Sequence, residues 1–106
     1  MSGEELMAEK IMINLDRRLK KIIPGFLENR RQELETLDEA CKKKKFKAIE
    51  DIGHQLMGSA GSYGFLTLSR LGKDLESAGK EKNLDKSQFI ISEITEHLEN
   101  LEIDFD

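Results

Sequence analysis

Residues 45–64 read KFKAIEDIGHQLMGSAGSYG. Small and apolar residues recur along this stretch at intervals of three or four positions: Phe46, Ile49, Gly53, Leu56 and Ala60. This spacing is typical of the buried stripe of an α-helix. The glycine-containing stretch from Gly58 to Gly64 is expected to end that helix.

Similar helical stripes lie on both sides of this segment. One follows Pro24, which suits the first turn of a helix because its missing N–H has no partner there. A later stripe stops at Gly79, and the last follows Asp85 and Gln88, which resemble a capping box. Stripes with spacings of three and four indicate antiparallel helices joined by short loops. Their members are Leu27, Leu34, Leu37 and Cys41; Leu68, Leu71, Leu75 and Ala78; and Ile91, Ile94, Leu98, Leu101 and Phe105.

The fold class predicted from these stripes is all-α. We expect an antiparallel four-helix bundle over residues 23–106, preceded by an N-terminal helix and connector over residues 1–22. Ser2 and Glu5 have the spacing of a capping box, and an apolar stripe that includes Leu6, Ile11 and Leu15 follows them. Strands are not expected, because no alternation of apolar and polar residues extends beyond a few positions.

Length and composition limit the possible functions. The chain has 106 residues and a net charge of −4, which disfavours general binding to nucleic acid. Its one cysteine, Cys41, excludes an internal disulfide framework and is expected to be a buried apolar filler. No apolar run is long enough to cross a membrane, and no signal-peptide core is present near Met1. We therefore expect a cytoplasmic monomer that does not bind membranes.

His54 lies outside the buried stripe of its helix. At about 100° per residue, the stripe centres roughly 120° away from His54, so the imidazole is expected to face water. Met57, Gly58 and Gly61 share its face, and each glycine inside a helix costs about 1 kcal/mol relative to alanine. Two explanations remain open. The glycines either let another protein surface approach the imidazole, or they allow tight packing and unwinding at the helix end.

An exposed neutral imidazole is a competent nucleophile near pH 7. One ring nitrogen must be free while an acceptor holds the other. On the next helix, Glu76 follows Leu75 just as His54 follows Gly53. In an antiparallel pair Glu76 could therefore orient the ring, although an exposed helix carboxylate with no such role has the same pattern.

The segment His54-Gln55-Leu56-Met57-Gly58-Ser59-Ala60, with Gly64 following, resembles the signature of histidine phosphotransfer (Hpt) domains, His-x-Leu-Lys-Gly-Ser-Ala…Gly. The resemblance covers most of the chain and is closest to a stand-alone, single-domain member. Supporting segments lie before and after the signature: Ile23-Pro24-Gly25-Phe26-Leu27, Phe46, Ile49 and Gly53, then Tyr63-Gly64-Phe65 and Leu71-Gly72-x-x-Leu75-Glu76. It implies a four-helix bundle that carries a phosphoryl group, in agreement with the stripes.

The resemblance also implies roles for individual residues. His54 would accept the phosphoryl group, and Glu76 would orient its ring. The partner would be a response-regulator receiver domain or a hybrid sensor histidine kinase, and a receiver would bring the acceptor Asp and the Mg²⁺. The chain itself would then be a phosphocarrier rather than an enzyme, with no cofactor or metal of its own. The docking surface would include Gln55, Met57, Gly58 and Gly61, with Tyr63 and Phe65 at its rim.

One position departs from the family pattern. The family has a lysine three residues after the histidine, where this chain has Met57. A cation there would offset the phosphoryl charge, so Lys47 and Lys73 are candidate substitutes within the partner-docking surface. The alternative function is a degenerate Hpt-like module that binds receivers without carrying phosphate. A metal-binding bundle is disfavoured, because His54 and His97 are the only histidines and no Glu-x-x-His pair is repeated.

Overall fold

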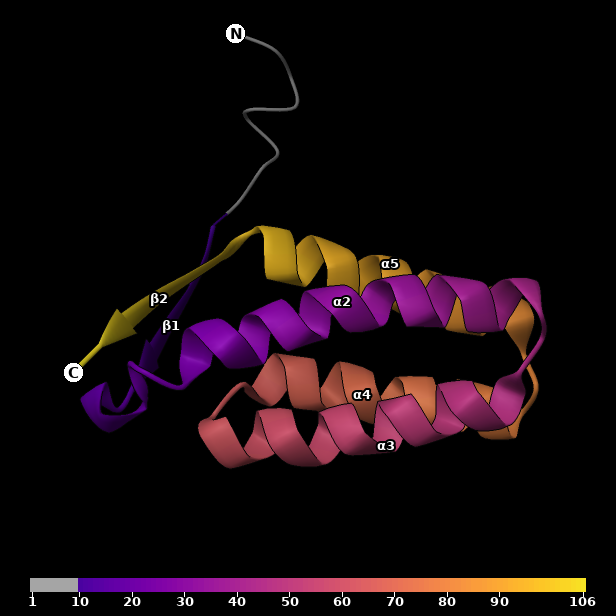
Figure 1. The fold of residues 1–106 in the computed structure, drawn as a ribbon, viewed down its shortest axis with the longest axis horizontal. Coiled ribbons are helices and arrows are strands. Elements are labelled where there is room, and N and C mark those ends of the chain that lie inside the picture. The colour runs from indigo at the N-terminus through magenta and orange to yellow at the C-terminus, as the bar shows by residue number, and fades with distance from the viewer. Residues whose placement is uncertain (1–9) are drawn as a thin grey trace, which may run out of the picture.

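The computed structural model describes residues 10–106. Four helices account for most of them: α2 (Ile23–Lys42), α3 (Phe46–Tyr63), α4 (Leu66–Lys80) and α5 (Leu84–Glu99). Each helix runs opposite to the one before it in the chain (Figure 1). The bundle has two layers, of which α2 and α5 form one and α3 and α4 form the other. The predicted four-helix bundle is confirmed. None of the helices in this range is both long and apolar enough to cross a membrane.

The bundle core includes most residues of the predicted stripes, together with others such as Phe26, Phe65 and Ile90 that the stripes did not include. Ile49, Leu56 and Ala60 of α3 are at most 3% exposed, and Leu68 and Leu75 of α4 are fully buried. Cys41 is buried among apolar residues, and its burial, together with the nearby charge of Asp38, raises the pKa of the thiol. The thiolate form is therefore disfavoured, as expected for a cysteine that fills space.

The ends of α3 and α5 follow from local chemistry. Gly64 ends α3 in the left-handed conformation, with φ of 95°, which glycine adopts without steric cost. The start of α5 differs from the expected capping box at Asp85 and Gln88. Asn83 caps this helix instead, since its side chain accepts a hydrogen bond of 3.0 Å from the backbone N–H of Lys86.

Helices α3 and α4 approach each other closely along a row of glycines. A Cβ atom added to Gly53 would lie 2.5 Å from the backbone nitrogen of Glu76, and one added to Gly72 would lie 2.6 Å from that of Met57. A Cβ atom added to Gly79 would likewise lie 2.5 Å from the backbone nitrogen of Glu50. The backbones of the two helices therefore touch where any larger residue would separate them.

Two short strands correct the all-α prediction. β1 (Ile11–Leu15) and β2 (Leu101–Phe105) form a two-stranded parallel sheet beside one end of the bundle, with Ile13 paired to Ile103 (Figure 1). Leu15 is buried, and apolar residues at alternate positions of both strands pack against the core. The predicted extension of the last helix to Phe105 is wrong, because α5 ends at Glu99.

The predicted N-terminal helix is wrong where the structure describes it, since residues 11–15 are extended. The rest of that prediction, including the capping box of Ser2 and Glu5, lies outside the described residues. Residues 101–105 alternate fully between apolar and polar side chains, and residues 11–15 do so in part. The apolar residues of both segments also fit the spacing of a helical stripe. Pairing between segments 90 positions apart selects the strand.

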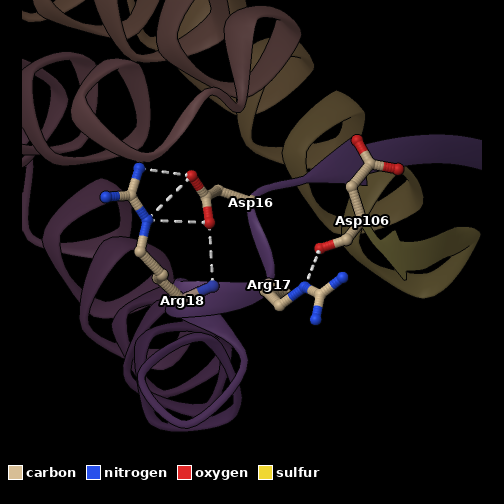
Figure 2. A network of polar contacts seen from close by, with 4 residues as sticks. All are labelled: Asp16, Arg17, Arg18 and Asp106. Atoms are coloured by element: carbon tan, nitrogen blue, oxygen red, sulfur yellow. Dashed lines mark hydrogen bonds and ion pairs between the residues drawn. The ribbon is translucent and has the colours of Figure 1, made fainter.

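Polar contacts hold the end of the sheet to the start of the bundle. Asp16 caps the short 3-10 helix η1 (Arg17–Leu19) and binds the guanidinium of Arg18 (Figure 2). Arg17 donates from its backbone N–H and from Nε to the carbonyl oxygen of Asp106, at 3.2 and 2.9 Å. The Arg18 contact lowers the pKa of the Asp16 carboxyl to about 2, so this carboxylate stays charged at neutral pH.

Candidate functional site

His54 lies near the middle of α3 with its side chain 65% exposed. Glu76 faces it from α4, and a Glu76 carboxylate oxygen, Oε2, lies 2.9 Å from the ring nitrogen Nδ1. The Glu76 side chain is 20% exposed. The carboxylate is thus held in the groove between the helices while the imidazole projects from it.

The contact depends on the glycine row described above. Gly53 directly precedes His54, and its missing side chain lets the backbone of Glu76 approach. The helix spacing that this contact sets brings the carboxylate within hydrogen-bond distance of the ring. Sequence offset alone places both residues on facing flanks, whereas the close approach of the backbones determines the distance between them.

The geometry favours one tautomer of a neutral imidazole. A carboxylate accepts hydrogen bonds, so Nδ1 carries the hydrogen and donates it to Glu76. The other nitrogen, Nε2, then has a free lone pair. A ring held in this way has one nitrogen available as a nucleophile.

Gly58 and Gly61 have different surroundings. Nothing lies within 4 Å of a Cβ atom added to Gly58, whereas one added to Gly61 would lie 3.1 Å from Oγ of Ser69. Gly61 therefore supports packing between α3 and α4. Gly58 is not required by packing within the described residues, and leaves bare backbone one turn from His54.

The other candidate residues on α3 surround the histidine without contacting it by any polar bond in residues 10–106. Gln55 is exposed, and its backbone carbonyl accepts a hydrogen bond from Ser59. Met57 is half-buried, and its carbonyl accepts a hydrogen bond of 2.7 Å from Ser69.

The two lysines proposed as substitute cations are differently placed. Lys47 lies 3.2 Å from Asp51 and 3.6 Å from Glu50, and these carboxylates raise the pKa of its ammonium group. Lys47 lies about two turns before His54, and its positive charge is already paired with these carboxylates. Lys73 is exposed on α4, one turn before Glu76, and forms no ion pair within the described residues.

The expected docking rim is wrong for Phe65. Phe65 is fully buried and stacks on Phe26, with ring centroids 5.4 Å apart. Tyr63 is half-buried with its ring edge-on to Phe26. Phe65 therefore belongs to the core rather than to an exposed rim, whereas Tyr63 packs against the core and keeps part of its surface exposed.

Leu66 is an exposed apolar residue that the sequence analysis did not include. It is 74% exposed at the start of α4, on the same flank as Lys73 and about 15 Å along the helix from Glu76. Its exposure could have been predicted, because Leu66 lies outside the buried stripe formed by Leu68, Leu71 and Leu75. A single exposed leucine is common on protein surfaces and by itself does not mark an interface.

His97 belongs to a separate site. It is 6% exposed and lines a hollow of about 460 Å³ between α4 and α5, and its Nε2 has no hydrogen-bond partner within the described residues. Burial lowers the pKa of His97 below its ordinary value of 6.5. Residues 10–106 contain no group of three or more His, Cys, Asp or Glu side chains placed to hold a metal ion.

This burial predicts a pH dependence of stability. Below pH 6.5 the unfolded chain binds a proton at His97 more readily than the folded chain does, so the free energy of unfolding should fall as the pH falls. Denaturant titrations between pH 7.5 and 5.5 would measure this loss. The His97→Leu chain should show a shallower decline over that range, and equal slopes for the two chains would contradict the prediction.

These features define a class of protein: a helical bundle that presents one exposed, carboxylate-paired imidazole on its surface. Residues 21–104 match the family model of the Hpt domain, and the chain therefore belongs to the Hpt domain family. The resemblance noted in the sequence is confirmed. Comparisons with curated proteins and with solved structures found no match.

Membership of this family establishes the broad function. Hpt domains are phosphotransfer modules of phosphorelays in two-component signalling. They are phosphocarriers rather than enzymes, and they interact with receiver domains and kinases.

Proposed function

We propose that this protein carries a phosphoryl group on Nε2 of His54 and exchanges it with the aspartate of a receiver domain. A hybrid sensor histidine kinase is the expected source of the group, and the cytoplasm its expected location. The observation that carries the proposal is the 2.9 Å contact between Glu76 and Nδ1 on a ring that is 65% exposed. It leaves Nε2 free and accessible.

The transfer step follows from this arrangement. The lone pair of Nε2 attacks phosphorus, the bond between phosphorus and the aspartyl oxygen breaks, and the aspartate carboxylate leaves. The ring becomes positively charged as the N–P bond forms, and the Glu76 carboxylate stabilises that charge through the Nδ1 hydrogen. The reverse sequence returns the phosphoryl group to an aspartate.

This chain contributes mainly the position of the reacting nitrogen and little charge compensation. Phosphoryl transfer depends on alignment and on cations that spread the charge of the moving group. Met57 supplies no cation, and Lys47 is paired with Asp51 and Glu50. Lys73, which forms no ion pair within the described residues, is the candidate cation left on this chain, and we assign the rest of the compensating charge to the partner, which would supply Mg²⁺ with its aspartate.

The docking surface proposed for the partner lies around His54 on α3 and α4. Gly58 provides open backbone beside the ring, and Leu66 adds an exposed apolar contact. The rest of the proposed surface is formed by neighbouring positions on the two helices: Gln55, Met57 and Gly61 on α3, and Lys73 on α4. Lys47 lies at its edge, where its paired carboxylates offset its charge.

Transfer from a phosphorylated receiver tests the proposal. The protein would be mixed with Mg²⁺ and a receiver domain charged on its aspartate by a small phosphodonor, and then examined for acid-labile, alkali-stable phosphate. Label is expected on the wild-type chain and not on His54→Ala. The chain has a useful matched control in His97→Leu, which should be labelled as the wild type is, because His97 lies on another face.

The alternative is a degenerate module that docks on receivers without carrying phosphate, for which Met57 is the supporting feature. A receiver that binds the wild-type chain tightly but transfers no label to it would favour this alternative. Label that persists in His54→Ala would also contradict the proposal, since another residue would then be the acceptor.

A further inference from the structure

Within residues 10–106, β1 pairs only with β2, and no described strand pairs with its other edge. The bond from the Ile11 N–H to the Asn100 carbonyl (2.8 Å) and that from the Asp106 N–H to the Leu15 carbonyl (3.0 Å) show which residues bond across the sheet. In a parallel pair these are alternate residues of each strand. The N–H and C=O groups of Met12 and Asn14 therefore point away from β2, and no hydrogen bond to them is present within residues 10–106.

The two edges of the sheet differ in charge. The exposed face of β2 carries Glu102 and Asp104, whereas the corresponding positions of β1 are Met12 and Asn14. Charged side chains on an edge strand oppose pairing with another chain. β1 lacks this protection, and Met12 is 59% exposed.

β1 is complementary to itself in one antiparallel register. With Ile13 opposite Ile13 of a second copy, Met12 faces Asn14, Ile11 faces Leu15 and Lys10 faces Asp16. The last pair adds little, because the Asp16 carboxylate is already bound by the Arg18 guanidinium, and the register is favoured because none of its pairs places like charges opposite each other. The same arrangement of β2 about Ile103 would place Glu102 opposite Asp104 twice, and like charges in direct opposition are destabilising.

We propose that two copies of this chain associate through their β1 strands, forming a continuous four-stranded sheet of order β2-β1-β1-β2. The outward groups of Met12 bond to those of Asn14 on the other copy, and the two-fold symmetry repeats the pair, which makes four hydrogen bonds. The sequence analysis expects a monomer, and the measurement of mass described below distinguishes the two states.

The physical gain comes from completing a small sheet. A two-stranded sheet is marginal by itself, and additional strands with a shared apolar face stabilise it. Ile11 and Ile13 are half-buried on that face, so pairing the strands would cover apolar surface of theirs that is still exposed, whereas Leu15 is already buried in its own chain. Two paired five-residue strands bury less than a standard interface, so association is expected to be weak and to depend on protein concentration.

The dimer goes beyond the phosphotransfer function and does not depend on it. The sheet lies beside one end of the bundle (Figure 1), whereas His54 lies near the middle of α3. Each copy would keep its histidine face open to a partner.

Sedimentation equilibrium of the full chain tests the proposal. The wild-type mass should rise from 12.1 kDa toward twice that value with increasing concentration. Asn14→Pro removes an outward N–H without touching the bonds between β1 and β2, and should weaken association at least tenfold. Asn14→Thr keeps that N–H and is the matched control, which should associate like the wild type. Unchanged circular dichroism would show that both variants retain the bundle.

Amide hydrogen exchange identifies the edge. Protection of the Met12 and Asn14 amides should increase with protein concentration, while that of Ile13, which bonds within the sheet, should not. A wild-type chain that stays monomeric at millimolar concentration would overturn the proposal. So would a dimer that Asn14→Pro leaves intact, or protection of Met12 and Asn14 that is independent of concentration.

Discussion

The Gly53→Ala chain is expected to be less stable than the wild type by about 2 kcal/mol. The added Cβ would lie 2.5 Å from the Glu76 backbone nitrogen and 2.8 Å from the Gly72 carbonyl oxygen. Both are backbone atoms, so α3 and α4 must separate. Such overpacking costs typically 1–3 kcal/mol, and a clash with backbone atoms belongs at the upper end of this range, so that after a gain of about 1 kcal/mol in helix propensity a net loss of about 2 kcal/mol remains.

Gly58→Ala is the matched control on the same helix. Its Cβ meets nothing within 4 Å, so only helix propensity changes, and stability should rise by about 1 kcal/mol. Thermal unfolding would measure both variants. For a domain of this size, 1 kcal/mol corresponds to a shift of about 4–8 °C, so the two melting temperatures should differ by more than 10 °C. Equal stability of the two variants would contradict the close approach of α3 and α4 at Gly53.

Gly58→Ala also tests why a glycine occupies this position: to let a partner approach His54, or to allow close helix packing. A methyl group beside His54 narrows the approach of a docking partner while the fold becomes more stable. We therefore expect slower phosphoryl transfer in the more stable protein. A transfer rate equal to that of the wild type would show that open backbone at Gly58 is not needed for docking.

Glu76→Ala is expected to slow phosphoryl transfer to His54 by about tenfold. Loss of the carboxylate removes the hydrogen bond at Nδ1, which both selects the tautomer with a free Nε2 and stabilises the charged product. A hydrogen bond to a charged group contributes about 1.5–3 kcal/mol, and the exposure of His54 favours the lower end of that range. The rate of label transfer from a phosphorylated receiver would measure the effect.

Two further measurements separate this positioning role from a general loss of structure. Glu76→Gln keeps an acceptor oxygen for Nδ1 and should recover part of the rate lost in Glu76→Ala. Nitrogen NMR of the imidazole should show less of the Nδ1–H tautomer in Glu76→Ala than in the wild type. A tautomer population that does not change, or a Gln variant as slow as the Ala variant, would contradict the role assigned to Glu76.

Much of the bundle could be predicted from residue spacing. The stripes of α3 and α4 consist of Ile49, Leu56, Leu68 and Leu75, and these are the residues that the structure buries. Burial on one face of a helix imposes a repeat of three and four positions, which is visible without coordinates. The exposed position of His54 follows from the same geometry, because a residue off the stripe must face another direction.

The strands could not be predicted in this way. Residues 11–15 and 101–105 are too short to specify their own conformation, and Leu101 and Phe105 continue the helical spacing of α5. Their conformation is decided by pairing with each other, which local sequence does not encode. Phe65 was misassigned for a similar reason, since its stacking on Phe26 brings together residues 39 positions apart.

The sequence by itself therefore determined the helical bundle, its core, the family and the exposed histidine, because each of these follows from periodicity or from a contiguous motif. The tertiary structure decided the parallel sheet, the different surroundings of Gly58 and Gly61, and the 2.9 Å distance from Glu76 to His54. These features depend on how closely separate segments approach. That distance is set by contacts between backbones, such as the one at Gly53, which no single segment contains.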